Sequence, residues 1–145
     1  MSTRRIPVFE RERVVRDRDC DVLGHVNNLR WVRWVVELAE AHAEALGLPF
    51  ETCREQGGVW VVREQRLDYH QGALPGERLV ETTWVSEMRG ARSVRHARIA
   101  GAGGGLRFEA RTLWAFIDVA TMRPTRVPAA MRARFDVLDA PENVA

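Results

Sequence analysis

Apolar residues recur at helical spacing over one long segment, from Leu29 to Leu46. Two adjacent apolar stripes run along it, one of Trp31, Trp34, Val35, Leu38 and Ala45 and the other of Val32, Val36, Ala39, Ala43 and Leu46. Because the two stripes together make a wide apolar arc, we predict a helix that is largely buried. Asn27 or Asn28 can cap its start, since their side chains accept hydrogen bonds from free backbone N–H groups. Gly47, followed closely by Pro49, ends it.

After this helix the pattern changes to an alternation of apolar and polar positions, which predicts β-strands. Four strands are predicted, over Val59–His70, Leu79–Met88, Ser93–Ala100 and Leu106–Asp118. Their short connections indicate that they are antiparallel neighbours. Before the helix, a looser alternation predicts a partly exposed strand from Val8 to Asp19. A short helix is expected over Ala129–Phe135, and the tail from Asp139 onward is expected to fray.

The order of elements is therefore one strand, one long apolar helix and four antiparallel strands. A sheet with one apolar face can bury such a helix most economically by wrapping around it. The length of 145 residues fits one domain, from residue 1 to residue 145. We predict an α+β fold with a long central helix, a five-stranded antiparallel sheet and a short C-terminal helix.

The composition excludes some classes of function. The 22 basic and 20 acidic residues give a net charge of only +2, which does not favour a nucleic-acid partner. No segment resembles a signal peptide, and no apolar run reaches the roughly 18 residues of a membrane span, so a cytoplasmic protein is expected. Cys20 and Cys53 show no metal or redox spacing, and the histidines show no ligand spacing, so no metal is expected.

One short segment, DVLGHVNN, combines an acid, a glycine and a histidine directly before the helix. A helix start presents free N–H groups and a positive dipole end. Such donors suit a thioester carbonyl, whose oxygen gains negative charge during attack. A nearby carboxylate can act as a base toward water or attack the carbonyl itself. From the residues alone, a simple helix cap is the favoured explanation of the segment, because Asp and Asn before a helix usually act only as caps. Asp19 competes with Asp21 as the acid.

The longer run DCDVLGHVNNLRWVRWVVELAE resembles the signature of hotdog thioesterases of the 4-hydroxybenzoyl-CoA thioesterase type. Their pattern is Asp, two residues, Gly, and then a helix with an aromatic residue and a Trp one turn later. Asp21, Gly24, Trp31 and Trp34 match it without a gap. The HVNN piece is similar to plant acyl-ACP thioesterases, and the segments WVVREQRLDYHQGALPGERL and TRVPAAMRARF resemble later parts of the family.

The resemblance implies roles for three catalytic positions. Asp21 matches the catalytic carboxylate, as general base or as nucleophile. Asn28 lies where a backbone N–H polarises the thioester carbonyl. His25 matches a histidine that orients water or holds the acid, although a polar residue that lines the cleft passively is an equal alternative. Leu23 departs from the acyl-ACP branch, which has Asn there, so chemistry based on the Asp alone is implied.

Further residues are implied to meet the substrate. Around the acyl thioester these are Gly24, Val26, Asn27 and Trp31. Arg89 and Arg92 flank a predicted turn that contacts the CoA phosphates in relatives, although a solvated hairpin tip is an equal alternative.

The reaction so implied is the hydrolysis of an acyl-CoA or acyl-carrier-protein thioester to a carboxylic acid and a thiol, without a cofactor. The resemblance also implies a homodimer or homotetramer with the site at the subunit interface. A hotdog hydratase or dehydratase, and a non-catalytic acyl-CoA-binding protein, are the alternatives.

Overall fold

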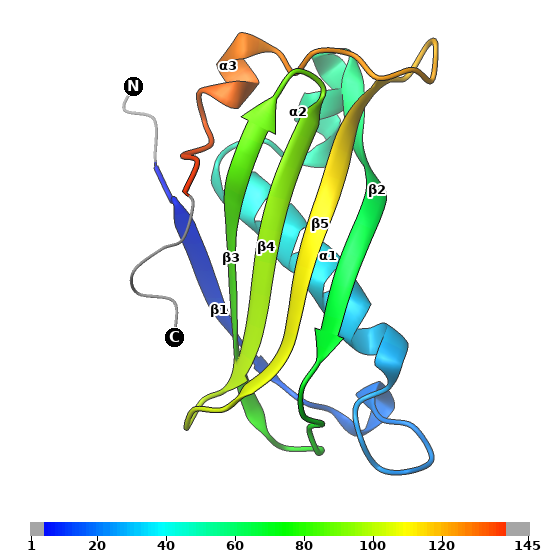
Figure 1. Ribbon diagram of the computed structural model, residues 1–145, viewed down its shortest axis with the longest axis vertical. Coiled ribbons are helices and arrows are strands. Elements are labelled where there is room, and N and C mark those ends of the chain that lie inside the picture. The colour runs from blue at the N-terminus through cyan, green and yellow to red at the C-terminus, as the bar shows by residue number, and fades with distance from the viewer. Residues whose placement is uncertain (1–4, 139–145) are drawn as a thin grey trace.

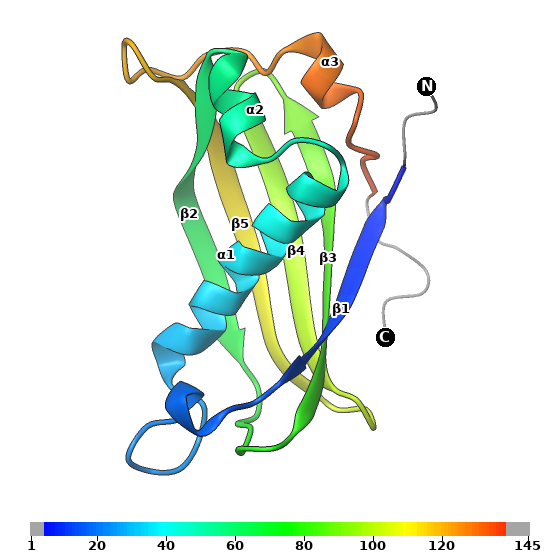
Figure 2. The ribbon, with the colours of Figure 1, turned by 180° about the vertical axis from the view of Figure 1, so that it is seen from behind.

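The computed structural model describes residues 5–138. The elements in chain order are β1 (Val8–Val14), the 3₁₀ turn η1 (Asp17–Asp19), α1 (Asn28–Ala45), α2 (Phe50–Glu55), β2 (Gly58–Tyr69), β3 (Arg78–Arg89), β4 (Arg92–Gly101), β5 (Leu106–Asp118) and α3 (Ala129–Arg132). The strands form one antiparallel sheet in the order β1-β3-β4-β5-β2. Helix α1 crosses one face of this sheet (Figures 1 and 2). The predicted α+β arrangement of a long helix and a five-stranded antiparallel sheet is confirmed.

The neighbours of the second strand differ from the prediction. β3, β4 and β5 are consecutive antiparallel neighbours, but β2 pairs with β5 instead of β3. The strand next to β3 on its other side is β1. The segment between β2 and β3 is therefore a crossing from one edge of the sheet to the far side and is not a hairpin. β2 and β1 become the two edge strands.

Two element boundaries also differ from the prediction, and one short helix was not predicted. The first strand ends at Val14, because the chain turns into η1, where the Asp19 carboxylate accepts a hydrogen bond from the Arg16 N–H at 2.8 Å. Helix α2 was not predicted, since six residues are too few to show a period. The last helix is shorter than predicted and ends at Arg132. The tail from Asp139 lies outside the described residues.

The apolar stripe of α1 forms the centre of the core. Trp34 is 1% exposed and Leu38 is 0% exposed, and they pack with residues of β3, β4 and β5. The ring of Trp31 stacks on Phe108 of β5 at a centroid distance of 5.6 Å. The cap is Asn27, whose side chain accepts from the Leu29 N–H at 2.9 Å. The helix therefore starts where the sequence predicts, within one residue.

A buried acid ties the edge strand β1 to the sheet. Glu81 on β3 is fully buried, and its two carboxylate oxygens accept from Arg11 at 2.8 Å and Arg13 at 2.6 Å, both on β1. The Arg13 guanidinium also lies over the ring of Trp34 at 4.7 Å. Two cations therefore compensate this buried charge, as burial of a carboxylate requires.

Helix α1 offers a matched test of this packing in two leucines. Leu38→Ala removes a fully buried side chain and leaves a cavity, so we expect a loss of about 2–5 kcal/mol in the free energy of unfolding. Leu29→Ala changes a side chain that is 77% exposed and should alter it by no more than about 0.5 kcal/mol. Urea denaturation of the two variants measures the difference, and equal losses would contradict the assigned orientation of the helix.

Candidate active site

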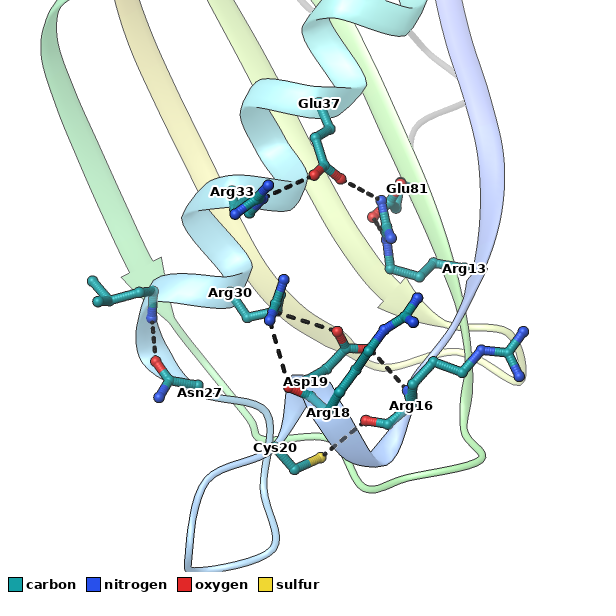
Figure 3. Close-up of polar contacts among 11 residues, drawn as sticks. Arg13, Arg16, Arg18, Asp19, Cys20, Asn27, Arg30, Arg33, Glu37 and Glu81 are labelled. Atoms are coloured by element: carbon teal, nitrogen blue, oxygen red, sulfur yellow. Dashed lines mark hydrogen bonds and ion pairs between the residues drawn. The ribbon is translucent and has the colours of Figure 1, made fainter.

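The segment between η1 and α1 is a closed loop fastened by backbone hydrogen bonds. Cys20 and Val26 form an isolated antiparallel bridge, and the Asn27 N–H donates to the Asp19 carbonyl at 2.9 Å. The Val26 N–H donates to the carbonyl of Ala73, in the segment before β3, at 3.0 Å. The loop projects beyond the start of α1 (Figure 3). Its backbone thus has a defined shape although its tip is exposed.

Asp21 is an exposed acid at the base of this loop. Its backbone carbonyl accepts from the Gly24 N–H at 3.0 Å, and its Oδ1 accepts from the Leu23 N–H at 2.9 Å. Gly24 has φ +82°, a left-handed conformation that glycine adopts at little cost. The glycine bend therefore turns the chain back and keeps the second carboxylate oxygen of Asp21 available.

The helix start next to this loop has a free donor. Asn28 is the first residue of α1, and its N–H donates no hydrogen bond to any of the described residues 5–138. No acidic residue lies in the first turn of α1, so the positive end of the helix dipole is not neutralised there. A donor and a partial positive charge at one point are what a developing oxyanion requires.

Two further side chains border the loop. The ring of His25 is exposed and lies against Gly72, where an added Cβ would stand 3.7 Å from two ring carbons. The hydroxyl of Tyr69, at the end of β2, donates to the Asn28 carbonyl at 2.9 Å and links the edge strand to the helix start. No pattern in the sequence predicts this contact between two distant segments.

Asp19, the alternative acid, is used structurally. It is 6% exposed, its Oδ2 accepts from the Arg16 N–H, and its Oδ1 lies 3.3 Å from Arg30 Nε (Figure 3). Since both oxygens are engaged, Asp19 holds η1 against α1. Asp21 is the acid of this segment that remains accessible.

The other residues predicted for the site fall into two groups. Val26 and Trp31 are buried in the core cluster of this protomer, so any contact with substrate stays a prediction. Arg89 and Arg92 flank the β3–β4 turn, which lies at the end of the sheet near α2 and α3, opposite the Asp21 loop (Figure 1). Both are exposed, and Arg92 Nε lies 3.0 Å from a carboxylate oxygen of Glu87.

The β3–β4 turn borders a hollow of about 390 Å³. Besides Arg89 and Arg92, a third arginine, Arg63 of β2, lines it together with the apolar residues Leu113 and Pro124. Three guanidinium groups at one hollow can bind phosphate oxygens. One protomer therefore carries the acid and the basic hollow at opposite ends.

Within residues 5–138, no group of three or more histidines, cysteines or acids is arranged to hold a metal ion. None of the helices in that part of the chain is long and apolar enough to cross a membrane.

The sequence matches the model of one protein family, described as the Thioesterase-like superfamily, over residues 15–135. The chain belongs to this family. Membership supports acyl thioester hydrolysis in general terms, and it agrees with the resemblance noted in the sequence. No protein with a curated description matches.

Solved structures share the fold of this family member. A 1,4-dihydroxy-2-naphthoyl-CoA thioesterase from Synechocystis is 20% identical, with TM-score 0.83 over 92% of this chain and 99% of its own. An Asp-to-Asn variant of 4-hydroxybenzoyl-CoA thioesterase in complex with 4-hydroxybenzoyl-CoA is 21% identical, with TM-score 0.81 over 90% and 100%. A proposed oleoyl thioesterase of Lactobacillus plantarum is 18% identical, with TM-score 0.85. The match spans 95% of this chain but only 55% of that protein. At these identities the likeness establishes the hotdog fold.

The different settings of Asp19 and Asp21 predict different effects on stability. Asp19→Asn weakens a buried ion pair and should lower the free energy of unfolding by about 1–3 kcal/mol. Asp21→Asn keeps an oxygen for the Leu23 N–H at an exposed position and should change it by no more than about 0.5 kcal/mol. Chemical denaturation measures the free energy of unfolding of both variants. If Asp21→Asn lost more stability than Asp19→Asn, Asp21 would be a structural residue.

Proposed function

We propose that this protein hydrolyses an acyl thioester, with CoA as the favoured carrier, and that Asp21 is its catalytic carboxylate, as general base or nucleophile. The observation that carries the proposal is an exposed carboxylate in a closed loop directly before a helix whose first N–H, that of Asn28, donates to no acceptor within residues 5–138. His25, on the same loop, is a second polar group that can orient water. Family membership supports the general reaction.

In the proposed reaction, Asp21 removes a proton from water while the water oxygen bonds to the thioester carbon. The carbonyl oxygen becomes an oxyanion and accepts from the Asn28 N–H at the positive end of α1. The carbonyl re-forms as the C–S bond breaks, and the thiolate takes up the proton. If Asp21 attacks the carbonyl first, an anhydride forms and water then hydrolyses it to the same products.

A second copy of the chain would complete this site. β2 is an edge strand of twelve residues that begins with the apolar run Val59–Val62, whereas the other edge strand, β1, is short and highly charged. Charged edges resist pairing and apolar edges favour it. We therefore propose a two-fold dimer in which the β2 strands pair antiparallel to continue the sheet.

This pairing would join the two distant groups of site residues. β2 begins near α2 and the β3–β4 turn, and it ends at Tyr69, which bonds to the start of α1. An antiparallel partner therefore brings its Arg89 and Arg92 toward the Asp21 loop, where they can bind the phosphates of CoA. The exposed side chains of Val22 and Leu23 on that loop gain a surface to cover them.

The catalytic role of Asp21 is tested by Asp21→Asn. This variant cannot accept a proton, so we expect kcat for thiol release from acyl-CoA to fall by at least about 100-fold. Asp17→Asn, at an exposed acid of η1 outside the loop, is the control and should leave kcat unchanged.

Thiol release is measured with a panel of acyl-CoA and acyl-carrier-protein thioesters. Equal rates for Asp21→Asn and the unmodified protein would refute the assignment. Hydration of crotonyl-CoA without thiol release would favour a hydratase, and binding without any turnover would favour a non-catalytic protein.

The shared site is tested by mixing two inactive variants. Asp21→Asn lacks the acid, and the double variant Arg89→Ala/Arg92→Ala lacks the phosphate contacts. After mixing, unfolding and refolding, half of the dimers contain both chains, and each of these has one intact site, so about a quarter of the original activity should return. No recovery, with dimers demonstrated by light scattering, would show that each site is built from one chain.

A further inference from the structure

A cavity of about 350 Å³ lies between the second half of α1 and the sheet. Its walls are mainly apolar, and their large apolar side chains are Phe50, Trp60, Met88, Trp114 and Phe135. On the helix side Ala39 and Ala43 present only methyl groups, which leaves the space open. The cavity is thus at the end of α1 opposite the Asp21 loop of the same protomer.

The buried side of this cavity contains a positive charge. Arg95 on β4 is 6% exposed, and one of its terminal nitrogens donates to His42 Nδ1 at 2.8 Å and to Thr83 Oγ1 at 3.1 Å. His42 Nε2 donates to the Ile6 carbonyl at 2.6 Å, which leaves Nδ1 as an acceptor and the imidazole neutral.

The charge states at neutral pH follow from burial. Desolvation, with a smaller contribution from Arg95, lowers the pKa of His42 to about 4, so the imidazole is uncharged. Desolvation lowers the pKa of Arg95 to about 10, so the guanidinium keeps its charge. Both hydrogen-bond partners of Arg95 are therefore neutral groups, and so is Phe135, over whose ring the guanidinium lies at 6.0 Å from the centroid.

No carboxylate among residues 5–138 forms an ion pair or a hydrogen bond with Arg95. Glu81 shows the contrast, because two arginines compensate its buried charge. The acids that line the cavity, Glu40 and Glu44, are exposed residues of α1. A buried cation without an anion is costly, and an anionic ligand would remove that cost.

Two other donors line the same cavity. The indole N–H of Trp114 is buried and has no hydrogen-bond partner within the described part of the chain. Ser93, also buried, contributes a hydroxyl. Arg95, Trp114 and Ser93 thus give the cavity three donor residues, while most of its other lining residues are aromatic or aliphatic, as in sites for small amphipathic ligands.

We propose that this cavity binds an organic anion with an apolar body and a terminal carboxylate, which pairs with Arg95. The apolar body packs against Trp60 and Phe50. Such a group has two sources: a free carboxylic acid, or the far end of an acyl group whose other end is the thioester. The second source rests on the proposed function, because only the β2-paired dimer turns this cavity toward the Asp21 loop of the other copy.

Direct binding of decanoate and of decan-1-ol to the full-length protein tests the site without any turnover. Calorimetry measures the two affinities, and so does the change in intrinsic tryptophan fluorescence, to which the cavity residues Trp60 and Trp114 contribute. We expect decanoate to bind at least about tenfold more tightly than the alcohol, because only the carboxylate pairs with the guanidinium. Arg95→Met should abolish this preference and leave the affinity for the alcohol unchanged, whereas Arg54→Met, at an exposed arginine of α2, should preserve it.

Ala43→Leu fills part of the cavity from α1 while Arg95 itself is kept, and it should weaken the binding of both ligands. This variant tests the proposal even if Arg95→Met does not fold. Unchanged decanoate binding in Ala43→Leu, or equal affinities of the two ligands in the unmodified protein, would overturn the proposal. Binding that appears only in Glu40→Gln/Glu44→Gln would also overturn it, since the arginine would then be paired internally.

Kinetics separate the two sources. If the carboxylate is the far end of a substrate, Arg95→Met lowers kcat/KM for suberyl-CoA by at least about tenfold relative to octanoyl-CoA. If the carboxylate belongs to a free acid, Arg95→Met loses decanoate binding. The ratio of kcat/KM for suberyl-CoA to that for octanoyl-CoA then stays the same as in the unmodified protein. If neither thioester is hydrolysed, the proposed function fails and the binding experiment alone decides the site.

Discussion

The burial of α1 against the sheet is the constraint on which the rest of the molecule depends. A helix with an apolar arc as wide as that around Trp34 and Leu38 must be covered along its length, and the long antiparallel strands provide that cover. The same packing positions both ends of the helix. Its start carries the free N–H of Asn28 beside the acid, and its second half lies over the cavity with the buried Arg95. One rigid element therefore holds the reactive groups and the space for a ligand.

The spacing of apolar residues along the chain was sufficient to predict the long helix and the strands, each of which buries one face. The long helix and the strand Leu106–Asp118 were predicted to within one residue, because burial on one side imposes a period on the sequence. The strand order could not be obtained in this way. α1 and α2 carry the chain across the sheet, so β2 starts at the far edge and β1 occupies the place next to β3. That choice depends on packing between distant segments, which leaves no local pattern.

The candidate site shows the same division. Asp21, the bend at Gly24 and the cap at Asn27 are features of consecutive residues, and the sequence indicated all of them. The contact between Tyr69 and Asn28 joins residues 41 positions apart and could not be predicted. The separation of Arg89 from Asp21 likewise follows only from the assembled sheet, as does the burial of Arg95 without an ion pair to any acid of residues 5–138.

The loop that carries Asp21 is fastened by its backbone, through the Asp21–His25, Gly24–Asp21 and Val26–Ala73 hydrogen bonds, while the side chains at its tip face solvent. The folding free energy is therefore nearly independent of which residues occupy the positions of Val22 and Leu23. Mutation can sample new side chains there without first gaining stability elsewhere. A scaffold built in this way can diverge in specificity through its loop tip, while Gly24 and Asn27 preserve the geometry on which any such variant relies.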